Sequence, residues 1–176
     1  MRISGSFAET MTTARQRRKR YRTADAAFAS LLAILAAVAP ASRAATTETL
    51  VVDRYTGLAI GGYDPVAFYT EGKPVAGSPD FELEYSGAIW RFRNIGNREA
   101  FAARPDIYMP KFGGYDPVGV AHGVAVAGNP GVWAITGGQL FLFYDRDRLA
   151  AFAADAQRIT SVAERKWPDV LRTLSP

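Results

Sequence analysis

The hexapeptide Gly-Gly-Tyr-Asp-Pro-Val occurs twice in this chain of 176 residues, at positions 61–66 and again, unchanged, at 113–118. Paired glycines permit positive φ angles or a close backbone approach, and an aspartate before proline can accept a hydrogen bond from a nearby backbone N–H. Each copy therefore predicts a turn. We expect the two turns to lie on either side of one cleft, where Tyr63, Asp64, Tyr115 and Asp116 would bind a ligand. The alternative interpretation is that both aspartates only cap turns and strands.

Two hairpins are predicted after these turns. Apolar and acidic residues alternate over 81–85, and a Ser-Gly pair then leads to a second apolar run over 88–92. A second hairpin is predicted from the apolar runs 132–135 and 139–144, which flank a turn at 136–138. A period of two residues is typical of strands with one buried face. Shorter strands are expected at 50–53 and 66–69.

Helices are predicted around the hairpins. Asp145 is a natural N-cap for a helix with apolar residues on one face, and Asn97 could cap a helix that ends before Pro105. A last helical stretch begins near Ile159 and is expected to restart at Pro168, a first-turn position. Together these elements predict an α+β fold, with a small and mainly antiparallel sheet of hairpins, flanking helices and C-terminal helices.

The first 44 residues have the layout of a secretory signal peptide. A basic segment at 15–22 precedes an apolar segment at 26–39 and the small residues Ser42 and Ala44. We expect cleavage after Ala44, with no stable membrane span afterwards, because the apolar segment is shorter than the roughly 20 residues that cross a bilayer. The protein would then be periplasmic or extracellular. Residues 45–57 are expected to form a linker and first strand, and residues 58–176 a single domain.

The basic character of the chain comes from this leader. Residues 1–44 contain 8 of the 21 lysines and arginines but only 2 of the 17 aspartates and glutamates, which leaves 13 basic and 15 acidic groups in the remainder. The mature domain would carry a net charge of −2, which argues against nucleic acid as a partner. The chain has no cysteine, so disulfides, thiolate metal sites and cysteine nucleophiles are excluded.

The sequence resembles the YHS domain family. The resemblance runs from about residue 58 to 167 and is carried by residues 59–69, 72–75, 77–79, Phe81, Phe101, Pro105, Tyr108, 113–115, Pro130, Trp133 and 140–142. It implies the fold more firmly than an activity, because exported members of this kind are mostly uncharacterised. The wider family is associated with metal binding, in part through a cysteine in the second Gly-Gly-Tyr motif. Asp116 stands at that position here, and its hard oxygen ligands disfavour copper(I) and weaken a zinc site.

Few other residues offer chemistry. His122 is the one histidine of the chain, so a site with two or three histidines cannot form within it. A divalent ion such as Ca²⁺ or Mg²⁺, held by Asp64 and Asp116 with or without His122, is one hypothesis. An enzyme with a His122–aspartate acid–base pair is another. A Gly-x-Ser-x-Gly nucleophile motif and a phosphate-binding glycine loop are absent from the sequence.

These observations favour a small exported binding or accessory domain without catalysis of its own. Its ligand site would lie between the two Gly-Gly-Tyr-Asp-Pro turns. The identity of the small ligand or protein partner is left open by the sequence.

Overall fold

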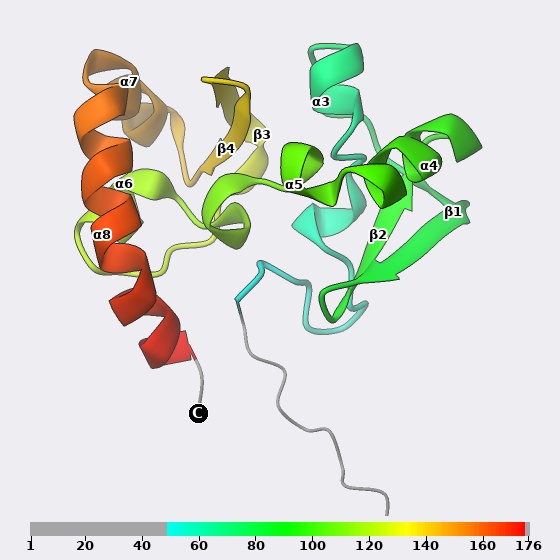
Figure 1. Ribbon diagram of the computed structural model, residues 1–176, viewed down its shortest axis with the longest axis horizontal. Helices are drawn as coiled ribbons and strands as arrows, with labels where there is room; N and C mark the ends of the chain where they lie inside the picture. The colour runs from blue at the N-terminus through cyan, green and yellow to red at the C-terminus, as the bar shows by residue number, and fades with distance from the viewer. Residues whose placement is uncertain (1–48, 175–176) are drawn as a thin grey trace, which may run out of the picture. The chain divides into compact units, whose positions relative to one another are not determined.

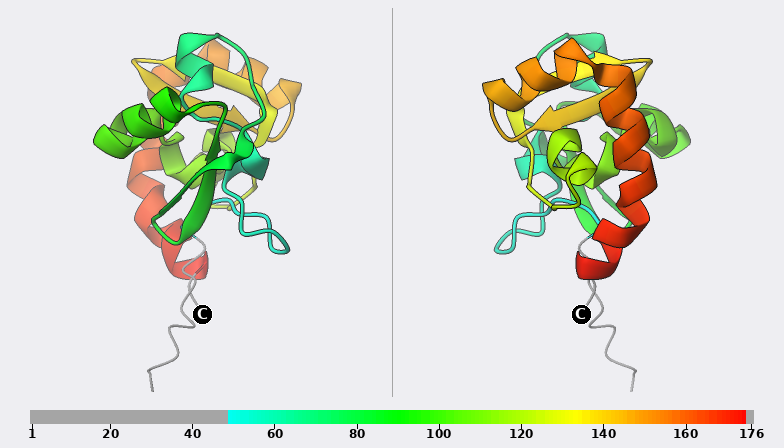
Figure 2. Two further views of the ribbon diagram at one scale, coloured as in Figure 1. Left: turned by 90° about the vertical axis from the view of Figure 1, so that its right-hand side faces the viewer. Right: turned by 90° about the vertical axis from the view of Figure 1, so that its left-hand side faces the viewer.

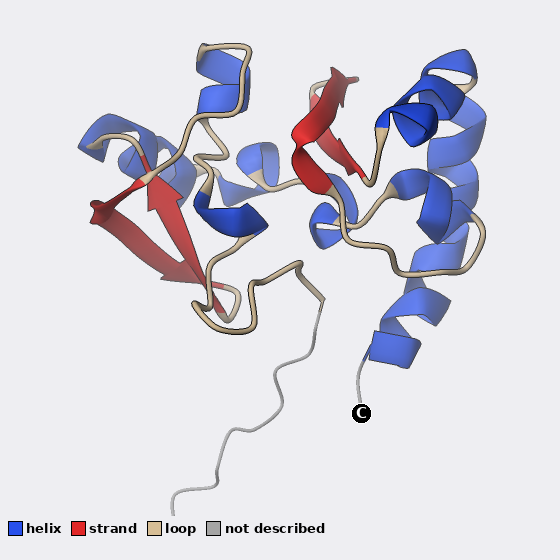
Figure 3. Ribbon diagram, turned by 180° about the vertical axis from the view of Figure 1, so that it is seen from behind, coloured by secondary structure: helices blue, strands red, loops and turns tan. Residues whose placement is uncertain are grey.

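The computed structural model describes residues 49–174 as an α+β fold with two separate antiparallel hairpins, as predicted from the sequence (Figures 1 and 3). The first half contains η2 (Ile60–Gly62), α3 (Ala67–Thr70), β1 (Ser78–Tyr85), β2 (Ala88–Phe92) and α4 (Ile95–Ala103). A short helix, α5 (Pro105–Tyr108), leads to the second half. There the same order recurs in η3 (Lys111–Gly114), α6 (Pro117–Ala121), β3 (Asn129–Thr136), β4 (Gln139–Phe143) and α7 (Arg146–Ala154), and α8 (Ala156–Leu174) follows.

The hairpins of the two halves share their lengths and their irregularity. β1 and β3 each have eight residues, β2 and β4 each have five, and in both pairs the register shifts four residues into the longer strand. Equivalent glycines precede the hairpins: Gly77 donates to the carbonyl of Gly62, and Gly128 to that of Gly114, at 2.9 Å in each case. The second half is therefore a structural repeat of the first.

Each glycine before a hairpin is required by a close backbone approach. A Cβ atom at Gly77 would lie 2.5 Å from the backbone carbonyl carbon of Arg91, and a Cβ atom at Gly128 would lie 2.6 Å from the Cβ of Leu142. The glycines of both hexapeptides have positive φ angles, as the sequence predicted. The hexapeptide turn can therefore pack directly against the following hairpin.

Equivalent side chains begin the helix after each hairpin. Asp145 caps α7 by accepting a hydrogen bond of 2.9 Å from the backbone N–H of Arg148, so this prediction is confirmed. Asn94 caps α4 by accepting one of 2.8 Å from the backbone N–H of Asn97. The helix therefore begins three residues earlier than expected, and Asn97 lies inside it, because Asn94 directly follows the end of the hairpin and satisfies the first free N–H groups.

Three other local predictions differ from the structure. Residues 66–69 belong to the end of the turn and to helix α3, because Asp64 accepts hydrogen bonds from the first backbone N–H groups there. In the segment 50–53, Val52 forms only an isolated bridge with Ala59. Pro168 lies inside the continuous helix α8, where the helix was expected to restart.

Strand β4 lies between two hydrophobic clusters. Leu140 and Leu142 pack with buried residues of the first half, whereas Phe141 and Phe143 pack with buried residues of the second half and of α8. Alternate side chains of a strand point to opposite faces, so one strand supplies both clusters. Helix α8 runs beside α6 and completes the second cluster through Ile159, Ala163 and Val170 (Figure 2).

Within residues 49–174, no helix combines the length and apolar character that a bilayer crossing needs. The predicted signal peptide, residues 1–44, lies outside the described residues.

Candidate functional site

The two hexapeptide aspartates are both fully buried, with 0% of either residue exposed. The partners of Asp64 all lie within residues 66–97, and those of Asp116 all lie within residues 118–148. Each carboxylate therefore faces into its own half of the repeat. This arrangement differs from the expected cleft, in which the two carboxylates would face one ligand.

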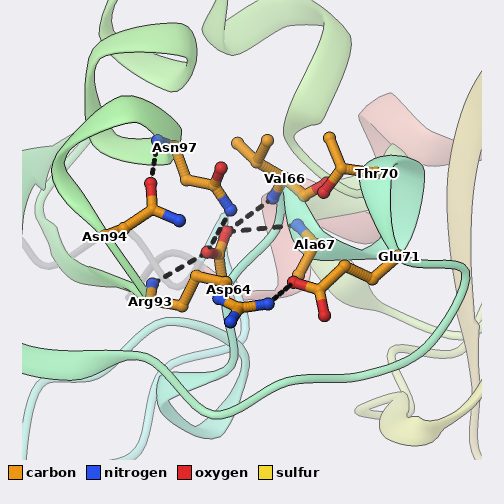
Figure 4. A network of polar contacts seen from close by, with 8 residues as sticks. All are labelled: Asp64, Val66, Ala67, Thr70, Glu71, Arg93, Asn94 and Asn97. Atoms are coloured by element: carbon orange, nitrogen blue, oxygen red, sulfur yellow. Dashed lines mark hydrogen bonds and ion pairs between the residues drawn. The ribbon is translucent and has the colours of Figure 1, made fainter.

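Asp64 accepts hydrogen bonds on both carboxylate oxygens (Figure 4). Its Oδ1 accepts from the backbone N–H groups of Val66 at 2.8 Å and Ala67 at 3.3 Å. Its Oδ2 accepts from the backbone N–H of Arg93 at 2.8 Å and from Nδ2 of Asn97 at 2.6 Å. The carboxylate thus joins the start of α3 to the start of α4, and its acceptor capacity is used within the fold.

A second layer of contacts covers this carboxylate. The side chain of Arg93 forms an ion pair with Glu71, which lies at the end of α3 (Figure 4). The pair joins the same two segments that Asp64 joins. Asp64 is therefore a structural centre of the first half, with its oxygens turned away from solvent.

Asp116 occupies the equivalent position with fewer partners. Its Oδ1 accepts a hydrogen bond of 2.9 Å from the backbone N–H of Val118 and so caps α6. Its Oδ2 has no hydrogen-bond partner among the described residues. Arg148, the third residue of α7, stands where the first half has Asn97, the third residue of α4, and its Nε lies 3.8 Å from Oδ2. The carboxylate of the second half is therefore buried like that of the first half, but it makes fewer hydrogen bonds.

Burial raises the pKa of Asp116 above its ordinary value, because a charged carboxylate is poorly solvated in this position. The nearby backbone N–H of Val118, the guanidinium of Arg148 and the amides of Gly119 and Tyr144 act in the opposite direction. Burial has the larger effect. Asp116 therefore carries an electrostatic cost that its hydrogen bonds offset only in part.

The two turns are joined through the backbone of Val51. The N–H of Val51 donates to the carbonyl of Gly113 at 2.8 Å, and the carbonyl of Val51 accepts from the N–H of Ile60 at 3.2 Å. A Cβ atom at Gly114 would lie 3.6 Å from Cγ2 of Ile60. Val51, which is half-buried, and Ile60, which is buried, thus occupy the space between the two turns.

The remaining predicted site residues lie apart from one another. Tyr63 packs against the first hydrophobic cluster, and Tyr115 is buried in the second, with its ring 5.9 Å from that of Trp167. His122 is exposed at the C-terminal end of α6. Within residues 49–174, no three His, Asp or Glu side chains are grouped so that they could hold a metal ion, so Asp64, Asp116 and His122 do not form the expected cluster.

An open groove of about 630 Å³ lies in the second half, at a place that the sequence did not indicate. The turn of the second hairpin, the start of η3 and one face of α8 form its walls. The residues that line it are Lys111, Thr136, Gly137, Gln139, Phe141, Ala156, Gln157, Thr160, Ser161 and Glu164. Its volume is in the range of small-molecule sites in proteins.

The groove contains hydrogen-bonding groups that the fold does not use. Five of its side chains are neutral and polar, and none of the five makes a side-chain hydrogen bond with another residue in the described range 49–174; they are Thr136, Gln139, Gln157, Thr160 and Ser161. In the sequence, the groove is indicated only by the spacing of Gln157, Thr160, Ser161 and Glu164. Residues three or four positions apart lie on one face of a helix. That spacing could not show which element the face would meet.

A second groove, of about 440 Å³, lies between β3 and α7. Its lining is mostly apolar and includes Trp133, Leu149 and Arg146. Neither groove includes Tyr63, Asp64, Tyr115 or Asp116 among its lining residues.

Comparison of the chain with protein-family models, with curated proteins and with solved structures gives no match. The resemblance to the YHS domain family therefore rests on the motifs of the sequence alone.

Proposed function

We propose that this chain is an exported, non-catalytic binding or accessory domain of the YHS type, and that its ligand site is the groove between the second hairpin turn and α8. Five polar side chains that line this groove and make no side-chain hydrogen bond within the described residues carry this proposal. Polar groups that the fold has not used are available to a ligand, whereas a saturated carboxylate is not.

The groove is favoured over the two turns because the turns are committed to folding. Asp64 accepts four hydrogen bonds from its own half of the chain. Asp116 is also buried, and Val51 fills the position where the two turns meet. A ligand that reached Asp64 would have to displace the backbone contacts that hold α3 in place. Oδ2 of Asp116 has no hydrogen-bond partner in the described residues, but its burial closes it to a ligand.

The direct test is native mass spectrometry of the intact chain, as it is isolated from its own host, together with the variant Thr160→Trp. The indole would fill the groove from helix α8, so a molecule retained by the natural chain should be lost from the variant. Gln157→Trp repeats the test at a more exposed position, in case Thr160→Trp disturbs folding. Lys166→Trp is the matched control, because Lys166 is exposed on the same helix and does not line the groove.

Retention of the same molecule by both groove variants would refute the placement of the site. Loss from the control as well as from the groove variants would do so too, because the effect would then not be specific to the groove. A thermal unfolding curve for each variant separates loss of binding from loss of folding.

Two alternatives from the sequence stay predictions: a divalent metal site that uses Asp64, Asp116 and His122, and an enzyme with a His122–aspartate pair. Elemental analysis of the isolated chain tests the first, and the expected outcome is less than stoichiometric metal. For the second, His122→Ala removes the proposed acid or base, and we expect no change in the binding of the retained molecule.

A further inference from the structure

The groove has no net charge. Lys111 and Glu164 are its only charged lining residues, and their side chains form an ion pair with 2.9 Å between Nζ and Oε1. A ligand with a single charge would have to compete with this pair for one of its members and leave the other without its partner. Because the two charges cancel and both side chains are partly exposed, the groove offers a simple anion or cation no net electrostatic attraction.

Only two apolar side chains line the groove, although the aliphatic parts of its polar side chains add apolar surface. Its one aromatic side chain, Phe141, is only 3% exposed and packs into the second hydrophobic cluster, 5.0 Å from the ring of Phe152. The ring thus forms a floor beneath the groove and does not present a face on which a planar ligand could stack. Ala156 is the only other apolar side chain in the lining.

We propose that the groove takes a neutral, hydroxyl-rich small molecule, such as a sugar or a polyol. This inference rests on the proposed function, because it assumes that the groove is the ligand site. A hydroxyl group both donates and accepts, and so it matches the hydroxyls of Thr136, Thr160 and Ser161 and the amides of Gln139 and Gln157. Neighbouring hydroxyls can also donate to the Glu164 carboxylate and accept from the Lys111 ammonium while that ion pair stays intact.

The comparison of the two halves supports a specialised role for this groove. In the first half, α4 is followed by the four-residue helix α5, whereas in the second half α7 is followed by the 19-residue helix α8. Helix α8 supplies five of the lining residues, so the first half has no equivalent wall. The wall that α8 forms is therefore a feature of the second half that the first half lacks.

The test is saturation-transfer NMR with the intact chain and a panel of small probes of defined chemistry. Methyl α-glucoside and sorbitol represent neutral hydroxylated ligands, and maltotetraose represents the end of a longer glycan. Glucuronate, glucosamine and octanoate represent anionic, cationic and apolar ligands. Thr160→Ala and Gln157→Ala remove lining groups one at a time, and Lys166→Ala is the control.

The expected result is that a neutral hydroxylated probe binds at least tenfold more tightly than the charged and apolar probes. Thr160→Ala and Gln157→Ala should each weaken that binding severalfold, and Lys166→Ala should leave it unchanged. Tighter binding of the monosaccharide than of maltotetraose would identify a free sugar or polyol as the ligand, and the reverse order would identify a glycan chain.

Two results would overturn the inference, and they differ in what they say about the proposed function. If glucuronate, glucosamine or octanoate binds best and Thr160→Trp blocks it, the groove is a ligand site but the assigned chemistry is wrong. If no probe binds, or if no groove variant changes the affinity of the probe that binds, the neutral-ligand inference fails. The proposed function also fails if native mass spectrometry shows that the natural chain retains no molecule, or that Thr160→Trp retains the same molecule.

Discussion

The two equivalent buried aspartates should respond very differently to the same substitution. In Asp64→Asn, the amide oxygen can keep the bonds from the start of α3, but the new NH₂ group would face the backbone N–H of Arg93, which donates to Oδ2 in the natural chain. Asn97 can rotate its side-chain amide to present an oxygen, whereas the Arg93 backbone cannot adapt in this way. One buried donor is left unsatisfied, at a cost of about 1–3 kcal/mol, and the remaining bonds lose the strength that the charge gave them.

The total loss expected for Asp64→Asn is about 2–4 kcal/mol in the free energy of unfolding. In Asp116→Asn, the amide oxygen keeps the bond from Val118, and the NH₂ group replaces an oxygen that had no hydrogen-bond partner. The variant gives up an attraction to Arg148, a partly exposed side chain at 3.8 Å, and to the amides of Gly119 and Tyr144, but it also removes a buried charge. We expect a change of less than about 1 kcal/mol in either direction at neutral pH.

The assay is urea unfolding followed by tryptophan fluorescence, since Trp90 is fully buried in the first cluster. Equal slopes of the free energy of unfolding against urea concentration would show that the variants and the natural chain expose the same amount of surface when they unfold. Asp145→Asn is the matched control, because asparagine is as good an N-cap as aspartate and little change is expected there. The reasoning is refuted if Asp116→Asn is destabilised as much as Asp64→Asn, or more.

Three further outcomes follow from the same contacts. Burial raises the pKa of Asp116, so the folded state binds the carboxyl proton more tightly than the unfolded chain does. The stability gained in this way is fully present below the ordinary pKa of 3.8 and is lost as the pH rises through the folded-state pKa. The free energy of unfolding of Asp116→Asn should therefore fall less steeply with rising pH than that of the natural chain. Gly77→Ala should lower the free energy of unfolding in urea by about 1–3 kcal/mol, because the new Cβ would lie 2.5 Å from the backbone of β2. Gly131→Ala is the control and should cost much less, because the nearest atom to its Cβ would be a side-chain oxygen at 3.2 Å. Tyr69→Phe should cost about 1 kcal/mol in the same assay, because the Tyr69 hydroxyl donates to the carbonyl of Ile107 at 2.7 Å, and an unchanged midpoint would contradict this.

The sequence predicted the parts of the fold that depend on short-range pattern. Alternation over 81–85 identified the first hairpin, and two apolar runs around a glycine-containing turn identified the second. Asp145 was identified as a cap because it precedes an amphipathic segment. Residues 66–69 were predicted as a strand because three of the four are Val, Phe and Tyr, which favour strands. In the structure, the carboxylate of Asp64 binds the backbone of this segment, and that contact overrides the intrinsic preference.

The candidate site depends on contacts between segments far apart in the sequence. Repetition of the hexapeptide drew attention to Asp64 and Asp116, but only the folded chain shows that their partners include Arg93, Asn97 and Arg148. The groove could not be found from spacing, because the hairpin turn and α8 that form it are about 20 residues apart and neither contains a recognisable motif.

The most direct test of this account is a map of the backbone amide resonances of the intact chain that shift when methyl α-glucoside is added. The account predicts shifts at the hairpin turn and along the groove face of α8, centred on Gly137, Gln139 and Thr160, with the two hexapeptides unaffected. Shifts centred instead on residues 61–66 and 113–118 would contradict it, because the ligand would then lie between the repeated turns.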